Sequence, residues 1–305
     1  MRKPPSCATR FRSSRHAIHS PHPGRSPQTL LFSFDKENSL NARLNCVRLL
    51  AFLGAFCVPA QLFAQSASLH SGNLNRLIAE GDELAKKLFD NQKALEKFQE
   101  ALALAPNEDE VLWRISRCYV DIGEHLPLTT EAEKEIQLGT YEKAMEFAER
   151  AVAVNPKSSM GYTRRAIANG RVALFKGVWS ALDFVKQAKM DCEKAIELDT
   201  NNNAAYYVLG RTHARVSETP RIVRWPLGLG WASLDDAIAN YEKAIQLRPD
   251  FIMYRLDAAR TYIEVEEYNK AREHLSVISL LPTQDEDDDQ FRRETKELME
   301  RIKEK

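Results

Sequence analysis

The sequence predicts an all-α protein, built as a solenoid of about five helical hairpins and closed by a C-terminal helix. Three observations indicate this class: one helical pattern recurs four times, most copies end in proline, and another amphipathic helix pattern follows each turn. Each copy places two alanines seven positions apart on one helix face, where a methyl group lets a neighbouring helix approach closely. The copies run from Ala94 to Pro106, from Ala144 to Pro156, from Ala188 to Thr200 and from Ala237 to Pro249.

Each copy is expected to be the second helix of a hairpin, with its partner helix before it in the chain. Residues 74–88 supply the opening helix, and residues 271–282 supply the closing one. The small residues that let paired helices approach one another are Gly81, Ser116 and Gly210. Hairpins of this kind bury their apolar faces only against one another, so about five of them can form one continuous core.

Three insertions lengthen the predicted hairpins. The first, about residues 124–141, starts a helix early, because Thr130 and Glu133 have the spacing of a capping box. The second, residues 176–187, is consistent with a longer helix. The third, residues 216–233, contains two Pro and two Gly, which forbid one continuous helix. We expect an apolar loop that packs over one end of the solenoid.

The alanines, small residues and terminal prolines resemble the tetratricopeptide repeat, which is about 34 residues long. Within that class, the order of motifs is similar to the regulator of microtubule dynamics family over roughly residues 74–305. The motifs that carry the resemblance are Glu110–Arg117, Glu131–Glu135, Tyr141–Ala144, Thr219-Pro220 and Pro282-Thr283. The resemblance implies a non-enzymatic repeat scaffold. It implies association with microtubules if the source is eukaryotic, and an exported or anchored repeat protein if the source is bacterial.

The N-terminal residues predict a leader followed by the repeat domain. Residues 1–42 form a basic head whose composition predicts disorder. Residues 43–64 combine basic residues, a short apolar run and a small final residue, as a signal peptide does. Export to the periplasm or the medium after cleavage near Ala64 is therefore expected. The alternatives are an uncleaved membrane anchor, or a mitochondrial or cytoplasmic location in a eukaryote. The remaining predicted segments are a linker at 65–73, the repeat domain at 74–283 and a capping helix at 284–305.

The sequence contains none of the common catalytic or nucleotide-binding motifs. It lacks a Gly-x-Ser-x-Gly elbow, a Gly-x-x-x-x-Gly-Lys loop and a His-Glu-x-x-His helix. Residues 1–64 contain nine of the 43 basic residues and two of the 43 acidic ones, so the remainder is acidic and disfavours nucleic acid. Cys118 and Cys192 are expected to be buried apolar groups. The sequence thus predicts no enzyme, no cofactor and no metal site.

The inner face of the predicted solenoid is the candidate binding site. Residues four positions apart in the first helix of each hairpin share that face, and five arginines there are expected to converge beside two aromatic residues. Arginine holds carboxylates and phosphates through a planar fork and stacks on aromatic rings. The alternative is that each arginine pairs with a carboxylate of its own repeat. The candidate residues are Trp113, Arg117, Arg171, Tyr207, Arg211, Arg215 and Arg260.

Two functions of different class remain open at this point. The first is a scaffold whose arginine-lined groove binds a protein or peptide partner with acidic groups. The second is a carrier for an anionic lipid or other amphiphile, in a pocket beneath the loop that contains Trp225 and Trp231. A large apolar cavity under that loop would favour the carrier, whereas a solid core would favour the scaffold.

Overall fold

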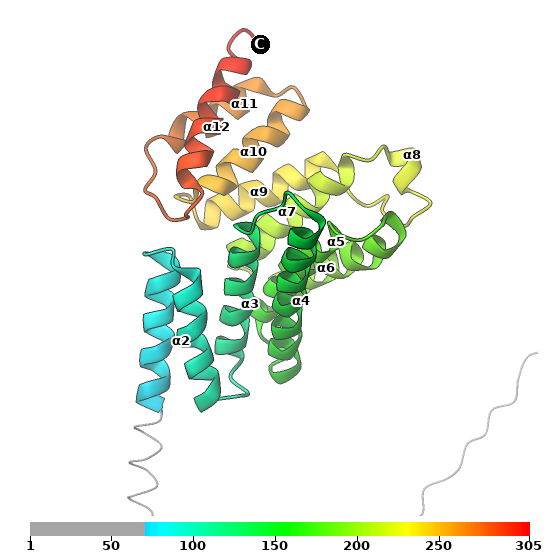
Figure 1. Ribbon diagram of the computed structural model, residues 1–305. Coiled ribbons are helices and arrows are strands. Elements are labelled where there is room, and N and C mark those ends of the chain that lie inside the picture. Colours follow the sequence, from blue (N-terminus) through cyan, green and yellow to red (C-terminus); the bar gives the residue numbers. More distant parts are fainter. Residues whose placement is uncertain (1–70) are drawn as a thin grey trace, which may run out of the picture. The chain divides into compact units, whose positions relative to one another are not determined.

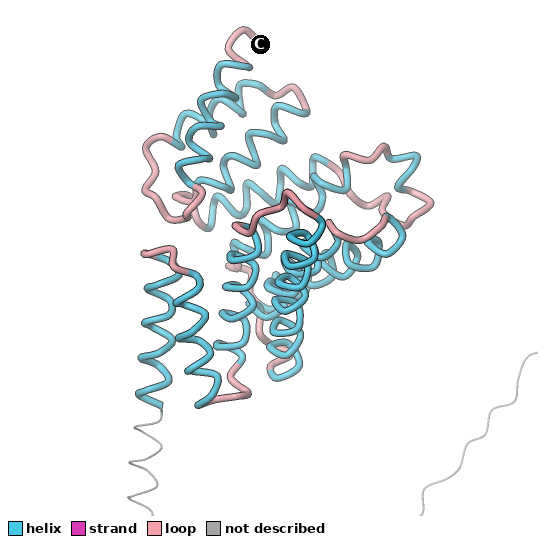
Figure 2. Tube along the Cα trace, viewed as in Figure 1, coloured by secondary structure: helices cyan, strands magenta, loops and turns pink. Residues whose placement is uncertain are grey.

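A computed structural model describes residues 71–305, and every regular element in that part of the chain is a helix (Figures 1 and 2). Residues 71–86 are helical and precede the first labelled element. The helices that follow are α2 (Asn91–Leu104), α3 (Asp109–Glu124), α4 (Glu131–Val154), α5 (Ser159–Ala173), α6 (Val178–Leu198), α7 (Asn203–Ser217), α8 (Arg221–Arg224), α9 (Leu234–Leu247), α10 (Ile252–Glu264), α11 (Tyr268–Ile278) and α12 (Asp288–Arg301).

These helices form five hairpins and a final helix, as predicted. Residues 71–86 pack against α2, and the next pairs are α3 with α4, α5 with α6, α7 with α9, and α10 with α11. Helix α12 packs on the last hairpin, where Leu298 and Ile302 join its core. The all-α solenoid that the sequence predicts is therefore confirmed.

The predicted small residues explain how closely the paired helices approach. Both alanines of the last full repeat, Ala237 and Ala244, are completely buried. A Cβ added to Gly81 would lie 2.5 Å from the ring of Phe98 in α2. A Cβ added to Gly210 would lie 3.0 Å from the carbonyl oxygen of Ala237. Side chains larger than these would therefore push the two helices of a hairpin apart.

The first two insertions have the predicted form. Helix α4 begins after Thr130, whose hydroxyl accepts from the Glu133 amide at 3.2 Å, while the Glu133 carboxylate accepts from the Thr130 amide at 2.8 Å. This reciprocal capping box satisfies backbone donors at the start of the helix. The second insertion extends α6, which begins at Val178.

The third insertion differs from the prediction of an apolar loop packed over the solenoid. Ile222 and Trp225 are 84% and 70% exposed, whereas the charged Arg224 is buried. The Arg224 guanidinium donates hydrogen bonds to the carbonyl oxygens of Thr219, Leu229 and Ala232. Carbonyls in a short irregular loop lack helix partners, and a buried carbonyl needs a donor. Arg224 therefore occupies the interior of this loop together with Leu229 and Ala232, whereas Ile222 and Trp225 are exposed.

The segment before α12 returns to the beginning of the array. Asn91 Nδ2 lies 3.5 Å from Glu286 Oε2, and His125 Nε2 lies 3.3 Å from Asp287 Oδ1. Figure 1 shows this loop beside the hairpin of residues 71–86 and α2. The segment before α12 is thus linked by polar contacts to the start of α2 and to the end of α3, across more than half of the chain.

The predicted basic head, signal peptide or anchor, and all but the end of the linker lie outside the described residues. Among the helices that the structure describes, none is both long enough and apolar enough to cross a membrane. The two cysteines of the described part, Cys118 and Cys192, are free and completely buried, as expected.

Candidate functional site

The inner face of the array forms one groove with a volume of about 1310 Å³. Its walls come mainly from the first helices of successive hairpins, α3, α5, α7 and α10, and the segment before α12 contributes at one edge. All seven candidate residues line the groove, whereas Leu256, which the helical spacing also places on this face, is buried in the core. The structure therefore brings these candidate residues together, although they are spread over four helices.

The loop tryptophans belong to a different part of the surface. Neither Trp225 nor Trp231 is among the groove-lining residues. The Trp231 ring instead packs edge-on against His213 at 5.0 Å, and Lys189 lies over its face at 5.4 Å. The predicted groove residues and loop residues thus form two separate sets.

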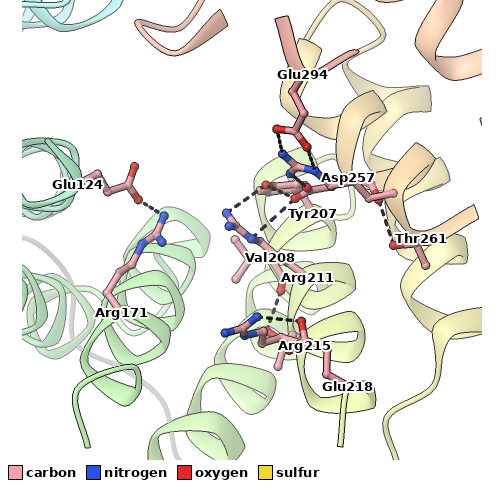
Figure 3. Close-up of polar contacts among 12 residues, drawn as sticks. Glu124, Arg171, Tyr207, Val208, Arg211, Arg215, Glu218, Asp257, Thr261 and Glu294 are labelled. Carbon is pink, nitrogen blue, oxygen red and sulfur yellow. Dashed lines mark hydrogen bonds and ion pairs between the residues drawn. The ribbon is translucent and has the colours of Figure 1, made fainter. Parts of the chain in front are cut away.

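Each of the five predicted groove arginines already contacts a carboxylate, and Figure 3 labels Arg171, Arg211 and Arg215. The pairs within one helix or its end are Arg117 with Asp121 at 3.1 Å and Arg215 with Glu218 at 2.9 Å. The pairs between hairpins are Arg171 with Glu124, Arg211 with Asp257 at 3.7 Å, and Arg260 with Glu294 at 2.8 Å. The alternative of a carboxylate in the same repeat therefore describes Arg117, Arg215 and Arg260, whereas Arg171 and Arg211 pair with a carboxylate of another hairpin.

A buried polar network connects α7 with α10 and α12. The Tyr207 hydroxyl donates to Asp257 Oδ2 at 2.7 Å, and Arg211 Nη1 donates to the Tyr207 oxygen at 3.3 Å. Arg260 contacts both Asp257 and Glu294. Burial is the main cause that raises the pKa of Tyr207 well above its usual value, so the hydroxyl stays a donor. The centre of this network is Asp257.

Sequence analysis missed Asp257 as a groove residue. It directly follows Leu256, which occupies the groove position of its helix, and the strict spacing of four excluded it. Its neighbours provide the signal that could have found it, because Arg260 is one turn away and an acidic residue at this spacing pairs with arginine on a helix surface.

Sequence analysis also missed Arg164, the groove cation that differs most from the others. The groove lining contains eight Lys and Arg side chains and seven Asp and Glu side chains. Seven of these cations contact a carboxylate, whereas Arg164 has no such contact in the described part of the chain. Burial, together with the nearby positive charge of Arg117, lowers the pKa of Arg164 to about 10. Arg164 is therefore the groove cation that has no carboxylate partner among the described residues.

A second arginine has a similar electrostatic environment. Burial and the nearby charge of Arg211 lower the pKa of Arg171 to about 10. Both arginines remain charged at neutral pH, because a pKa near 10 is far above it. A lowered arginine pKa records a site where additional negative charge would be favourable.

An array of helical hairpins with a lined concave face defines a repeat scaffold of the tetratricopeptide type. The family described as "Regulator of microtubule dynamics protein 1-3" matches residues 77–303. Because this match covers most of the sequence, the chain belongs to that family.

Relatives and solved structures agree with this assignment. Regulator of microtubule dynamics protein 1 of Bos taurus is 26% identical over 246 residues, which cover 78% of this chain and 76% of that protein. Protein 3 of Rattus norvegicus is 27% identical over 236 residues, but these cover 73% of this chain and only 48% of that protein. A thermophilic TPR protein of Thermus thermophilus has a similar fold, with a TM-score of 0.55 at 18% identity over 74% of this chain and 98% of that one.

Proposed function

We propose that this scaffold binds an extended acidic segment of a partner protein along its inner groove. The observation that supports the proposal is the continuous lining itself, in which four helices from separate hairpins contribute arginine and aromatic side chains to one surface. Arginine forks form charge-assisted hydrogen bonds with carboxylates, and aromatic faces accept apolar residues of the same peptide. An extended peptide is the ligand whose length suits a groove that crosses several repeats.

The existing ion pairs do not prevent such binding, because the weaker ones can exchange partners. Arg215 and Glu218 are largely exposed, and an exposed pair of this kind contributes little to stability. Arg211 lies 3.7 Å from Asp257, which is longer than a hydrogen bond. Its guanidinium therefore keeps N–H groups for a ligand carboxylate. A peptide carboxylate would replace a loose intramolecular contact at these positions.

The test is binding of a library of capped peptides that differ in the number of Glu and Asp residues. We expect acidic members to bind, and we expect Arg211→Gln to weaken their binding by about 1.5–3 kcal/mol, the scale of a hydrogen bond to a charged group. Arg211→Lys should recover only part of the loss, because an ammonium lacks the planar fork. Arg221→Gln is the matched control, since Arg221 is exposed on α8 and does not line the groove.

Two results would contradict the proposal. One is that no acidic peptide binds at all, and the other is equal binding by the parent protein and Arg211→Gln. If vesicles that contain anionic phospholipid bind while peptides do not, the carrier function becomes the better account. In that case the ligand would occupy the groove, because the loop tryptophans lie outside it.

The names of the relatives favour a second candidate partner, the microtubule. Co-sedimentation of the protein with polymerised tubulin tests it directly. We expect binding to depend on the groove, so Arg211→Gln should reduce the bound fraction and Arg221→Gln should not. Absence of the parent protein from the pellet would exclude this partner and leave the peptide proposal standing.

A further inference from the structure

Two hydrogen-bond donors in the groove have no acceptor, although both are buried. The indole Nε1 of Trp113 and the Nε of Arg164 are inaccessible to solvent, and within the described residues neither has a hydrogen-bond partner. Both groups can only donate, so no change of tautomer or amide orientation can satisfy them. Buried donors without acceptors are rare and unfavourable, and each one needs an explanation.

The side chains that carry the two donors lie near each other and belong to neighbouring hairpins. The guanidinium carbon of Arg164, in α5, lies 5.9 Å from the centre of the Trp113 ring, in α3. Trp113 is only 6% exposed, and both residues line the groove. The carboxylate of Asp121, which also acts electrostatically on Arg164, is already bound by Arg117 Nε at 3.1 Å. The Asp121 carboxylate is therefore already paired with Arg117 and is not the acceptor for Arg164.

We infer that Trp113 and Arg164 form a receptor for one singly charged oxyanion, which in a bound peptide is a carboxylate. This inference rests on the proposed peptide-binding function and names the part of the ligand that is held most specifically. The carboxylate oxygens accept from the indole N–H and from the guanidinium, which satisfies both donors. Arg164 has no ion pair to break, so its long side chain can rotate to meet the ligand.

The charges around Arg164 explain why the site suits a ligand with one negative charge. Arg117 and Asp121 neutralise each other, and Arg164 is a neighbouring cation that has no carboxylate partner among the described residues. A carboxylate balances it, whereas a phosphomonoester would bring a second negative charge beside Asp121. Met160, Phe251 and Tyr254 also line this groove, so an apolar neighbour of the carboxylate has a surface to contact. The preferred ligand feature is an acidic residue next to an apolar one.

Phenylacetate, phenylacetamide and phenyl phosphate are the probes for the site itself. They share a ring and differ in charge, and intrinsic tryptophan fluorescence reports on Trp113. We expect phenylacetate to change the emission, and we expect the neutral amide to have no effect and the phosphate to bind at least several-fold more weakly. Trp113→Phe identifies the reporting residue, because Trp179, Trp225 and Trp231 remain in that variant. Equal effects of amide and carboxylate would overturn the inference.

Peptides test the same site in its proposed context. Arg164→Gln should reduce binding of capped Glu-Leu and Asp-Phe peptides at least ten-fold, Arg164→Lys should reduce it less, and Arg221→Gln should leave it unchanged. If acidic peptides bind the parent and Arg164→Gln equally, the receptor is refuted while the scaffold proposal survives. If phenylacetate binds through Arg164 but no acidic peptide binds, the scaffold proposal fails and the oxyanion site stands. If vesicles of an anionic phospholipid, which carries a phosphodiester, bind through Arg164 while no peptide binds, the assignment of a peptide carboxylate as the ligand of this site is refuted.

Discussion

The interiors of the hairpins and the groove are built from the same helices but by different interactions. Inside the first hairpin, Ala94, Ala101 and Phe98 are almost completely buried, and apolar packing is the main contact between the two helices. In the groove, Arg211, Asp257 and their neighbours are joined by hydrogen bonds and ion pairs between repeats. Stability is therefore expected to depend on the first region and ligand recognition on the second.

The difference follows from what each region exposes to water. The interior of a hairpin is closely packed. A change of one methyl group therefore alters the packing and lowers the free energy of unfolding. The groove is open, and water and a ligand compete with its internal ion pairs. Substitutions in the two regions should consequently separate stability from binding, and the following predictions test that separation.

The largest expected effect is at Phe98, whose ring lies on Gly81 in the first hairpin. Phe98→Ala should lower the free energy of unfolding by about 3–5 kcal/mol, because it removes buried area and leaves a cavity. Urea denaturation measures the change. Leu88→Ala is the control, since Leu88 is 65% exposed at the end of the same hairpin. A similar small loss for both variants would contradict the predicted packing.

The next effect is at Ala244, which is completely buried in α9. Ala244→Leu should lower the free energy of unfolding by about 1–3 kcal/mol, because the larger side chain separates the packed helices. Thermal denaturation tests it beside Ala239→Leu, which adds the same atoms on an exposed position of α9. If the two variants melt at the same temperature, Ala244 is not at a close helix contact.

The contact between the end of α3 and the segment before α12 should depend on pH. Burial opposes protonation of His125, but the Asp121 carbonyl and the carboxylates of Glu286 and Asp287 outweigh it and raise the pKa of His125. Burial also raises the pKa of Glu286 and Asp285. All three groups bind protons more tightly in the folded contact, so the contact is strongest below about pH 6.5, the unperturbed histidine pKa.

As pH rises through the raised pKa of His125, this contribution is lost and the segment before α12 should open more often. Hydrogen exchange of the amides of residues 283–287, corrected for the intrinsic pH dependence of exchange, measures the opening. His125→Gln removes the titrating group and should largely abolish the pH effect. If the protection of these amides against exchange increases with pH in the parent protein, the predicted direction of the pH dependence is wrong.

The smallest expected effect is at the exposed pair of Arg215 and Glu218. Arg215→Gln should change the free energy of unfolding by no more than about 0.5 kcal/mol, as is typical of an ion pair on a helix surface. A double-mutant cycle with Glu218→Gln measures the interaction between them. A coupling above about 1 kcal/mol would mean that the groove charges also stabilise the fold, and the comparison between the two regions would fail.

The sequence by itself determined the helical array and its hairpins. The recurrence of alanine at a spacing of seven, with Gly81 and Gly210 opposite, specifies close helix pairs because these requirements are local and steric. The same periodicity placed Trp113, Tyr207 and five arginines on one face. Turn chemistry also predicted where α4 begins, since the capping box at Thr130 involves only neighbouring residues.

Only the tertiary structure decided which charges are neutralised. Arg211 meets Asp257 from another hairpin, and Arg164 meets no carboxylate within the described residues, although both are arginines on inner helices. The loop of residues 216–233 shows the same limit, because the buried Arg224 donates there to carbonyl oxygens that the fold brings around it. Helix periodicity is a property of neighbours in the chain, whereas charge compensation depends on groups that the fold brings together from distant repeats.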